Sequence, residues 1–337
     1  MRIKTSHKRL FINLILGLIL LFCLNVFLGS VKLSIKEFIT GLYDTNSTNY
    51  LIIHSLRIPK SLSSILIGIG LGLAGFLMQI LFRNPLSGPY VLGVTTGGSL
   101  GAAIFILGSS LFSIGFFHPK YGIPLFSSLG SLSVLSMILI VYKRIKDPMT
   151  LLITGILFSS ISGAVISILA YFSTAERLRE FVFWSYGSTH LMNSYELLIL
   201  TLSCGLCFVF ALKNSKLLEA FLAGDIMAKT LGVDVDKIRV QIILFTGLTV
   251  GVLTAFAGPI AFVGLVVPHI SRQILKTSNV QLQLISVCLI GSLFVLASDI
   301  VASLPSYAMS LPLNAVTSII GAPILLFIVI KTKRFIF

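Results

Sequence analysis

The sequence predicts an all-α integral membrane protein with about ten transmembrane helices. Of its 337 residues, 56% are hydrophobic and 11% are charged, and the mean hydropathy is +1.02. A soluble domain carries about 25% charged residues, so this composition cannot cover a water-facing surface of that size. A membrane-spanning helix needs about 20 mostly apolar residues, and runs of this kind occupy most of the chain. We therefore treat residues 1–337 as a single transmembrane domain.

Ten apolar runs define the expected spans. The first follows the basic segment 1–9; it is longer than the apolar region of a signal peptide and has no clear cleavage site, so we expect a retained helix. The eighth is short and holds Pro268 behind the Gly258–Pro259 pair, which predicts an interrupted helix that lines a cavity. The spans are residues 10–29, 60–81, 90–110, 122–142, 150–172, 194–212, 239–257, 259–271, 281–299 and 314–331.

The basic residues predict the orientation. With the N-terminus in the cytoplasm, 18 of the 25 lysines and arginines fall on the cytoplasmic side, as the positive-inside rule requires. Both termini are then cytoplasmic, which agrees with an even number of spans. The net charge of +14 is explained by this topology, so no nucleic-acid partner is expected.

The glycine pattern indicates helix packing, and the histidines and cysteines do not indicate a catalytic or metal site. Glycines four residues apart predict close helix packing at Gly68 and Gly72, at Gly93, Gly97 and Gly101, and at Gly247 and Gly251. The match of 97–101 to a G-x-S-x-G motif lies in a membrane helix and has no partner histidine and aspartate. The five histidines show no metal-ligand spacing. Cys204 and Cys207 form a C-x-x-C pair, but it lies in an apolar run without further ligands, where helix packing is the better interpretation. We expect no catalytic residue and no bound metal.

The acidic residues bear on what drives transport. None of the eleven lies in the middle of a span, and Glu196 and Asp299 lie near outer ends. An ion-coupled carrier usually needs an ionisable group at depth, so this alternative is disfavoured, although sodium can bind to carbonyls alone. The chain also lacks a phosphate-binding G-x-x-x-x-G-K-[ST] loop. Any ATP-driven motor is therefore expected on a separate subunit.

The longest expected cytoplasmic segment, 213–239, is amphipathic. Apolar residues recur there at helical spacing, and Gly224 and Gly232 predict a break into two short helices. Such a pair fits either a groove on a partner protein or the membrane surface, and the pattern alone does not separate the two.

Several ordered blocks give the chain a family resemblance. It resembles the FecCD-type permease subunits of ATP-binding-cassette (ABC) importers for iron–siderophore complexes, heme and vitamin B12. The blocks are 56–60 (LRIPK), 83–101 (RNPLSGPYVLGVTTGGSLG), 228–234 (AKTLGVD), 258–272 (GPIAFVGLVVPHISR), 311–312 (LP) and 320–323 (IGAP). Each short block is weak alone, whereas 258–272 and the ordered set are specific.

The resemblance implies a type II ABC importer permease. Such a subunit has ten spans and works as a dimer, of identical or related chains, with the transport path at the interface. Two ABC ATPase subunits bind the cytoplasmic loops and use the ATP, and a substrate-binding protein docks outside. The chain itself binds no cofactor. It would carry its cargo across the bacterial inner membrane by alternating access.

The resemblance also assigns roles to residues. The ATPase-coupling residues are Gly224, Asp225, Ala228, Leu231 and Gly232. The cytoplasmic gate comprises Asn84, Pro85, Leu86, Met149 and Thr150. The binding-protein docking residues are Arg57 and Lys60. The structural motif consists of Gly258, Pro259, Gly264, Pro268, His269 and Arg272, with His269 expected to form a structural hydrogen bond.

Two positions depart from the family pattern. Family members often carry an arginine where this chain has Ser303, and a glutamate where it has Ser310. Docking is therefore expected to rest on Arg57 and Lys60 alone, or on other outer cations. These other cations are Lys120, Arg177 and Arg179.

Overall fold

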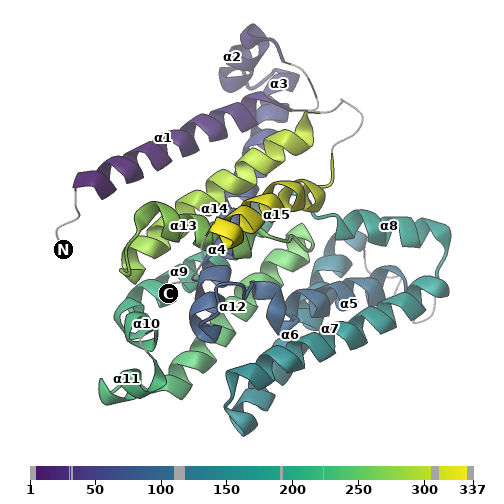
Figure 1. Ribbon diagram of the computed structural model, residues 1–337. Coiled ribbons are helices and arrows are strands. Elements are labelled where there is room, and N and C mark those ends of the chain that lie inside the picture. The colour runs from purple at the N-terminus through teal and green to yellow at the C-terminus, as the bar shows by residue number, and fades with distance from the viewer. Residues whose placement is uncertain are drawn as a thin grey trace.

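A computed structural model describes residues 5–29, 31, 33–109, 118–189, 193–222, 224–304 and 311–331, and these residues form helices joined by short links (Figure 1). The helices in chain order are α1 (Thr5–Phe27), α2 (Ile35–Tyr43), α3 (Thr48–Leu51), η1 (Ile52–Arg57), α4 (Ile58–Phe82), η2 (Pro89–Leu92), α5 (Val94–Ile106), α6 (Pro119–Ile145), α7 (Pro148–Tyr171), α8 (Ala175–Ser185), α9 (Ser194–Lys213), α10 (Ser215–Leu222), α11 (Asp225–Thr230), α12 (Val235–Ala257), α13 (Val263–Leu275), α14 (Val280–Ser303) and α15 (Leu313–Lys331).

Each of the ten expected spans coincides with a helix. Within the described residues, seven helical segments are long and apolar enough to cross a membrane: α1, α3 to α4, α6, α7, α9, α12 and α14. The other three expected spans correspond to the shorter helices α5, α13 and α15. The all-helical membrane fold predicted from hydropathy is therefore confirmed. The helices α2, α3, η1 and α8 lie largely outside the expected spans.

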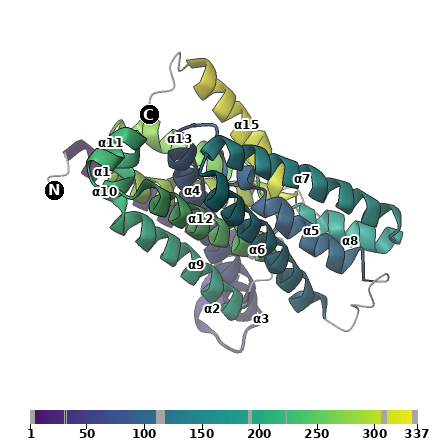
Figure 2. The ribbon, with the colours of Figure 1, turned by 90° about the horizontal axis from the view of Figure 1, so that it is seen from below.

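Helix α4 is the centre of the molecule. It packs against α9, α12, α13 and α14, and nearly every residue from Ile67 to Leu81 is buried (Figure 2). Glycine makes these contacts possible, because a Cβ at Gly68 would collide with the carbonyl group of Gly291 on α14. At this crossing point no side chain separates the two backbones, so α4 and α14 approach closely.

Helices α5 and α6 form a second close pair. A Cβ at Gly101 would collide with the carbonyl oxygen of Phe126, and one at Gly97 would lie 2.7 Å from that of Gly130. The predicted packing role of Gly97 and Gly101 is therefore confirmed. Gly93 instead caps the start of α5 at φ +72°, a left-handed conformation that favours glycine.

The interruption of the eighth span lies before Pro268, so its expected position is wrong. Residues 258–262 are not helical, whereas Pro268 is buried inside the continuous helix α13. Proline has no amide hydrogen to donate to the carbonyl oxygen of Gly264 one turn earlier. That carbonyl packs directly against Gly75 of α4, where a Cβ would collide with it. Contact with α4 thus keeps α13 helical at the turn where Pro268 removes one backbone hydrogen bond.

Two ends of the molecule matter for function. Helices α2 and α3 lie at one end, and α10 and α11 lie at the opposite end (Figure 1). We call them the α2 end and the α11 end. Helix α4 runs from the first to the second, since it follows α3 and finishes beside α10 and α11. Apolar side chains on the outer faces of α1 and α7 are exposed, as expected for contact with lipid or a second subunit.

Candidate functional sites at the two ends

The segment 213–239 forms the predicted helix pair. Helix α10 ends at Leu222, and α11 begins after Gly224, which adopts φ +120°. Gly232 follows α11 with φ +78°. Both glycines adopt backbone conformations that residues with a Cβ avoid, so the two predicted breaks are confirmed.

Helix α11 has a buried side and an exposed apolar side. Ala228 is fully buried, whereas the Ile226 side chain is 84% exposed. Met227 and Leu231 are also exposed beside it. Isolated exposed apolar residues are ordinary, but two in one short helix and a third at its C-cap form an exposed apolar patch, a feature typical of contact surfaces.

The start of α11 is tied to two spanning helices. The carboxylate of Asp225 forms ion pairs with Arg83, which follows α4, and with Arg239 in α12. Both guanidinium groups also lie against the buried ring of Phe221 at the end of α10. Asp225 was among the predicted coupling residues, but its two partners were not. Arg83 is distant in the sequence, and Arg239 belongs to another helix, α12.

The predicted gate residues 84–86 form a tight turn. The Asn84 side chain accepts a hydrogen bond from the amide of Leu86 (2.9 Å), and the Asn84 carbonyl accepts one from Ser87 (3.0 Å). His269 on α13 donates from Nε2 to the carbonyl of Pro85 (2.8 Å). The predicted structural hydrogen bond of His269 is therefore present, and it fixes this turn to α13.

The turn borders a cavity beside α7. The cavity has a volume of about 490 Å³ and is lined by Asn84 and Leu86 on one side and by Leu152 and Ile156 of α7 on the other. Serine hydroxyls contribute a few polar groups to a mostly apolar wall. Such a surface can contact a large solute without holding it tightly.

The other two predicted gate residues begin α7. Met149 is exposed, and Thr150 donates hydrogen bonds from its amide and its hydroxyl to the carboxylate of Asp147 (both 2.8 Å). These bonds hold the pKa of the Asp147 carboxyl below its ordinary value. Met149 and Thr150 lie one turn before the cavity and are not among its lining residues.

The predicted structural motif 258–272 joins three parts of the fold. Gly258 adopts φ +72°, and a Cβ there would lie 2.6 Å from the Trp184 carbonyl oxygen. Gly264 packs on the Pro89 ring, and Arg272 lies 5.9 Å from the centre of the Phe76 ring. Pro259 and its neighbours in the non-helical segment 258–262 line a small cavity. The motif therefore positions α13 against α4 and η2.

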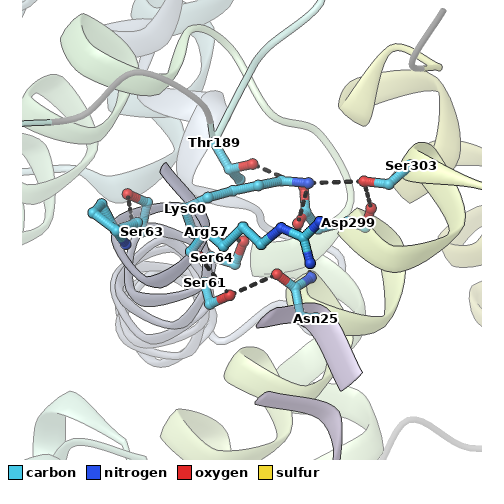
Figure 3. Close-up of polar contacts among 10 residues, drawn as sticks. Asn25, Arg57, Lys60, Ser61, Ser63, Ser64, Thr189, Asp299 and Ser303 are labelled. Atoms are coloured by element: carbon cyan, nitrogen blue, oxygen red, sulfur yellow. Dashed lines mark hydrogen bonds and ion pairs between the residues drawn. The ribbon is translucent and has the colours of Figure 1, made fainter. Parts of the chain in front are cut away.

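A buried polar network occupies the α2 end (Figure 3). Asp299, whose side chain is 2% exposed, forms an ion pair with Lys60 at 3.0 Å. Its carboxylate also accepts hydrogen bonds from Asn25 and Thr189, both at 2.8 Å. Lys60 in turn donates to Ser303 at 2.7 Å. The network joins α1, α4 and α14 to the segment before α9.

Arg57 is also engaged inside the protein. It is buried, and its guanidinium donates to the carbonyl groups of Val26, Phe27 and Val31. Val26 and Phe27 lie in the last turn of α1, where backbone carbonyls lack helical partners, so the arginine caps that helix. Neither Arg57 nor Lys60 presents a free cation at the surface, and their docking role stays a prediction that requires both to leave these contacts.

Asp299 corrects one expectation from the sequence. A buried carboxylate was expected to be missing, yet Asp299 is buried. Its charge is already matched by Lys60, and it lies near the end of α14 rather than at mid-span. The ion-coupled alternative therefore gains no support from it. Ser303 takes part in this network, whereas Ser310 lies outside the described residues.

Within the described residues, no group of three histidine, cysteine or acidic side chains is arranged to hold a metal ion. A model of the FecCD transport family matches residues 17–331. The chain belongs to the FecCD transport family. It is therefore a multi-pass membrane permease subunit of an ABC importer, and the resemblance seen in its sequence blocks is confirmed.

Relatives of this FecCD-family permease carry different cargoes. The vitamin B12 import system permease BtuC of Klebsiella pneumoniae is 32% identical over 285 residues, which cover 84% of this chain and 83% of the relative. The molybdate import system permease MolB of Haemophilus influenzae is 29% identical and covers 98% and 97% of the two chains.

Solved structures support the same fold. An ABC transporter in an inward-facing conformation, described as of the metal-chelate type, aligns with a TM-score of 0.85 and 29% identity. The alignment covers 96% of this chain and 99% of the other. PsaBC from Streptococcus pneumoniae aligns with a TM-score of 0.55 and 18% identity, which supports the fold alone.

Proposed function

We propose that this FecCD-family permease imports a large chelate or cofactor through the interface of a permease dimer by alternating access. The cargo class is an iron–siderophore complex, heme or a corrinoid. The relatives named for vitamin B12 import and the metal-chelate type transporter support this class. The cargo arrives with its metal already coordinated, so the chain needs no metal ligands, and ATP is hydrolysed on a separate ABC ATPase.

The exposed apolar side of α11 carries the proposal. Ile226, Met227 and Leu231 protrude from a helix that is braced by ion pairs to α4 and α12. An apolar helix seated in a partner's groove buries such side chains, and the brace gives the contact a way to move the spanning helices. Two ATPase subunits would bind the two copies of this surface in a dimer.

The proposed orientation places the α11 end in the cytoplasm. The basic residues expected on the cytoplasmic side include Arg83, Lys146 and Arg239, and ion pairs bring these three to the α11 end. The positive-inside rule then assigns this end to the cytoplasm and both termini with it. The α2 end faces a substrate-binding protein, and Lys120 and Arg179 remain exposed cations for that contact.

The test is ATPase coupling in a reconstituted membrane. The permease would be co-purified with its ABC ATPase in lipid nanodiscs, unchanged and as the variants Gly224→Trp and Leu231→Asp. We expect both variants to lose the partner or its coupled activity, because one distorts the break before α11 and the other places a charge on its apolar side. Ile145→Asp, at an exposed aliphatic residue of α6 near the same end, is the matched control.

Cargo transport gives the second readout. Proteoliposomes with an external binding protein would be supplied with cyanocobalamin, heme or an iron–siderophore complex together with ATP inside. Uptake of one of these that requires ATP would support the proposal. Uptake driven by an ion gradient from a permease purified alone would replace it with an ion-coupled carrier.

A further inference from the structure

A single carboxylate joins three helices at the α11 end. Asp225 is the first residue of α11, and one of its oxygens is bonded to the guanidinium of Arg83. The other oxygen lies 2.6 Å from Nη2 of Arg239 in α12. One side chain of α11 is therefore attached at the same time to the end of α4 and to the start of α12.

The two arginines are held in place from behind. Their Cζ atoms lie 5.0 Å and 5.3 Å from the centre of the buried Phe221 ring, and Nε of Arg83 donates to the Phe221 carbonyl (3.2 Å). Cations over an aromatic face are attracted by its quadrupole. The Arg239 side chain is only 8% exposed, against 35% for Asp225. Loss of the Asp225 carboxylate would therefore leave a buried charge without this ion pair, which is costly.

Glycines without close neighbours lie on both sides of α11. Gly224 precedes the helix and Gly232 follows it, and a Cβ at either position would meet no atom within 4 Å. The Asp225 ion pairs connect α11 directly to the ends of two spanning helices, and Ala228 is buried.

The partner of Asp225 leads directly into the turn beside the cavity. Arg83 has φ +46° and ends α4, and the exposed residues Asn84 and Leu86 follow at once. His269 holds the other side of this turn through the Pro85 carbonyl. A displacement of the Arg83 backbone would therefore shift the turn, whose residues Asn84 and Leu86 line one wall of the cavity against α7.

We propose that Asp225 is the positioning residue that transmits a displacement of α11, through Arg83, to the 83–87 turn and the cavity wall. The inference rests on the proposed function, because a bound ATPase is what displaces α11. Asp225 itself touches no cargo. Its role is to convert the movement of a short helix at the end of the molecule into a change at the turn.

The test measures the turn directly. Leu86→Cys, in a Cys23→Ser background, would be reacted with a charged maleimide in the permease–ATPase complex in nanodiscs. The labelling rate would be compared without nucleotide and with ATP plus vanadate. We expect the parent protein, in which the Asp225–Arg83 ion pair is intact, to give different labelling rates in the two states. Asp225→Asn and Arg83→Gln should bring the ratio of the rates to about one while the ATPase still co-purifies and hydrolyses ATP.

Two variants complete the design. Asp225→Glu keeps the charge and should restore the nucleotide dependence, which a merely structural defect would not. Lys146→Gln removes an ion pair to Asp236 at the same end that does not touch α11, and should leave the dependence unchanged.

Three results would overturn the inference. They are a nucleotide-dependent labelling rate that persists in both Asp225→Asn and Arg83→Gln, a loss of the ATPase from Asp225→Asn, or a Leu86→Cys rate in the parent that is the same with and without nucleotide. A parent chain that binds no ATPase would refute the proposed function instead.

Discussion

Several charged side chains in this permease are paired with residues of other helices. Lys60 and Asp299 pair at the α2 end, and Asp225 pairs with Arg83 and Arg239 at the α11 end. An unpaired charge between spanning helices is costly. Each of these side chains therefore lies where a neighbouring helix supplies a residue of opposite charge. These contacts hold the ends of α4 to different neighbours.

Loss of the buried pair at the α2 end should be strongly destabilising. Lys60→Met leaves Asp299 as an uncompensated buried charge, which costs about 3–5 kcal/mol in comparable pairs. The measurement is the free energy of unfolding in mixed detergent micelles. Lys216→Gln, which removes the exposed pair with Glu219, should change it by about 0–1 kcal/mol. Recovery in the double variant Lys60→Met/Asp299→Leu is expected; equal stability of Lys60→Met and the parent would contradict the assignment.

The start of α7 should be sensitive to acid. Hydrogen bonds from Thr150 lower the pKa of Asp147 in the folded protein. Because the folded pKa lies below the unfolded one, this stabilisation is complete at neutral pH and is lost as the pH falls through the folded pKa. Hydrogen exchange should show α7 less protected at its first turn in Asp147→Ala at pH 7. The difference from the parent should shrink below about pH 4; a difference that is independent of pH would rule this out.

Whole helices pack through bare backbone. Gly68 meets Gly291, Gly75 meets Gly264, and α5 meets α6 at Gly97 and its neighbours. Such contacts place helix axes close together, where lipid offers no hydrophobic force to drive association and close packing must replace it. The shape of the bundle around α4 thus depends on a few positions without a side chain.

A methyl group at one of these crossings should disturb the bundle. Gly75→Ala places its Cβ against the Gly264 carbonyl oxygen, and neither backbone can move without shifting a helix. We expect a loss of about 1–3 kcal/mol, seen as a lower melting temperature in detergent. Gly205→Ala in α9 is the control, since no atom lies within 4 Å of its Cβ, and it should be neutral or slightly stabilising. Equal melting temperatures of the two variants would contradict the packing argument.

The molecule as a whole has two chemically different ends. The α11 end gathers basic residues and an exposed apolar helix, whereas at the α2 end Lys60 pairs with the buried Asp299 and Arg57 binds backbone carbonyls. This asymmetry suits a permease that receives an ATPase on one side and a binding protein on the other. It also makes the topology directly testable.

Impermeant thiol labelling should distinguish the ends. In a Cys23→Ser background, Tyr43→Cys in α2 should react in spheroplasts, because it is exposed at the proposed outer end. Ile226→Cys in α11 should react only after the membrane is permeabilised. The reverse pattern would invert the topology and remove the α11 end as the site of the ATPase.

Local patterns alone determined much of this protein. Hydropathy located a helix at each of the ten expected spans, seven of them long and apolar enough to cross a membrane, because a helix in lipid must satisfy its own backbone and needs a fixed apolar length. Gly224 and Gly232 located α11, because positive φ is a local property of the chain. Ordered sequence blocks identified the FecCD family.

Only the tertiary structure decided which residues meet. It brought Arg57 to the carbonyls at the end of α1, paired Lys60 with Asp299, and joined Asp225 to two arginines. It also moved the break of the eighth span from Pro268 to 258–262, since the weakened turn of α13 is held by its contact with α4. The physical reason is common to all of these: a side chain's partner is set by how helices pack, and packing brings together residues that no local pattern connects.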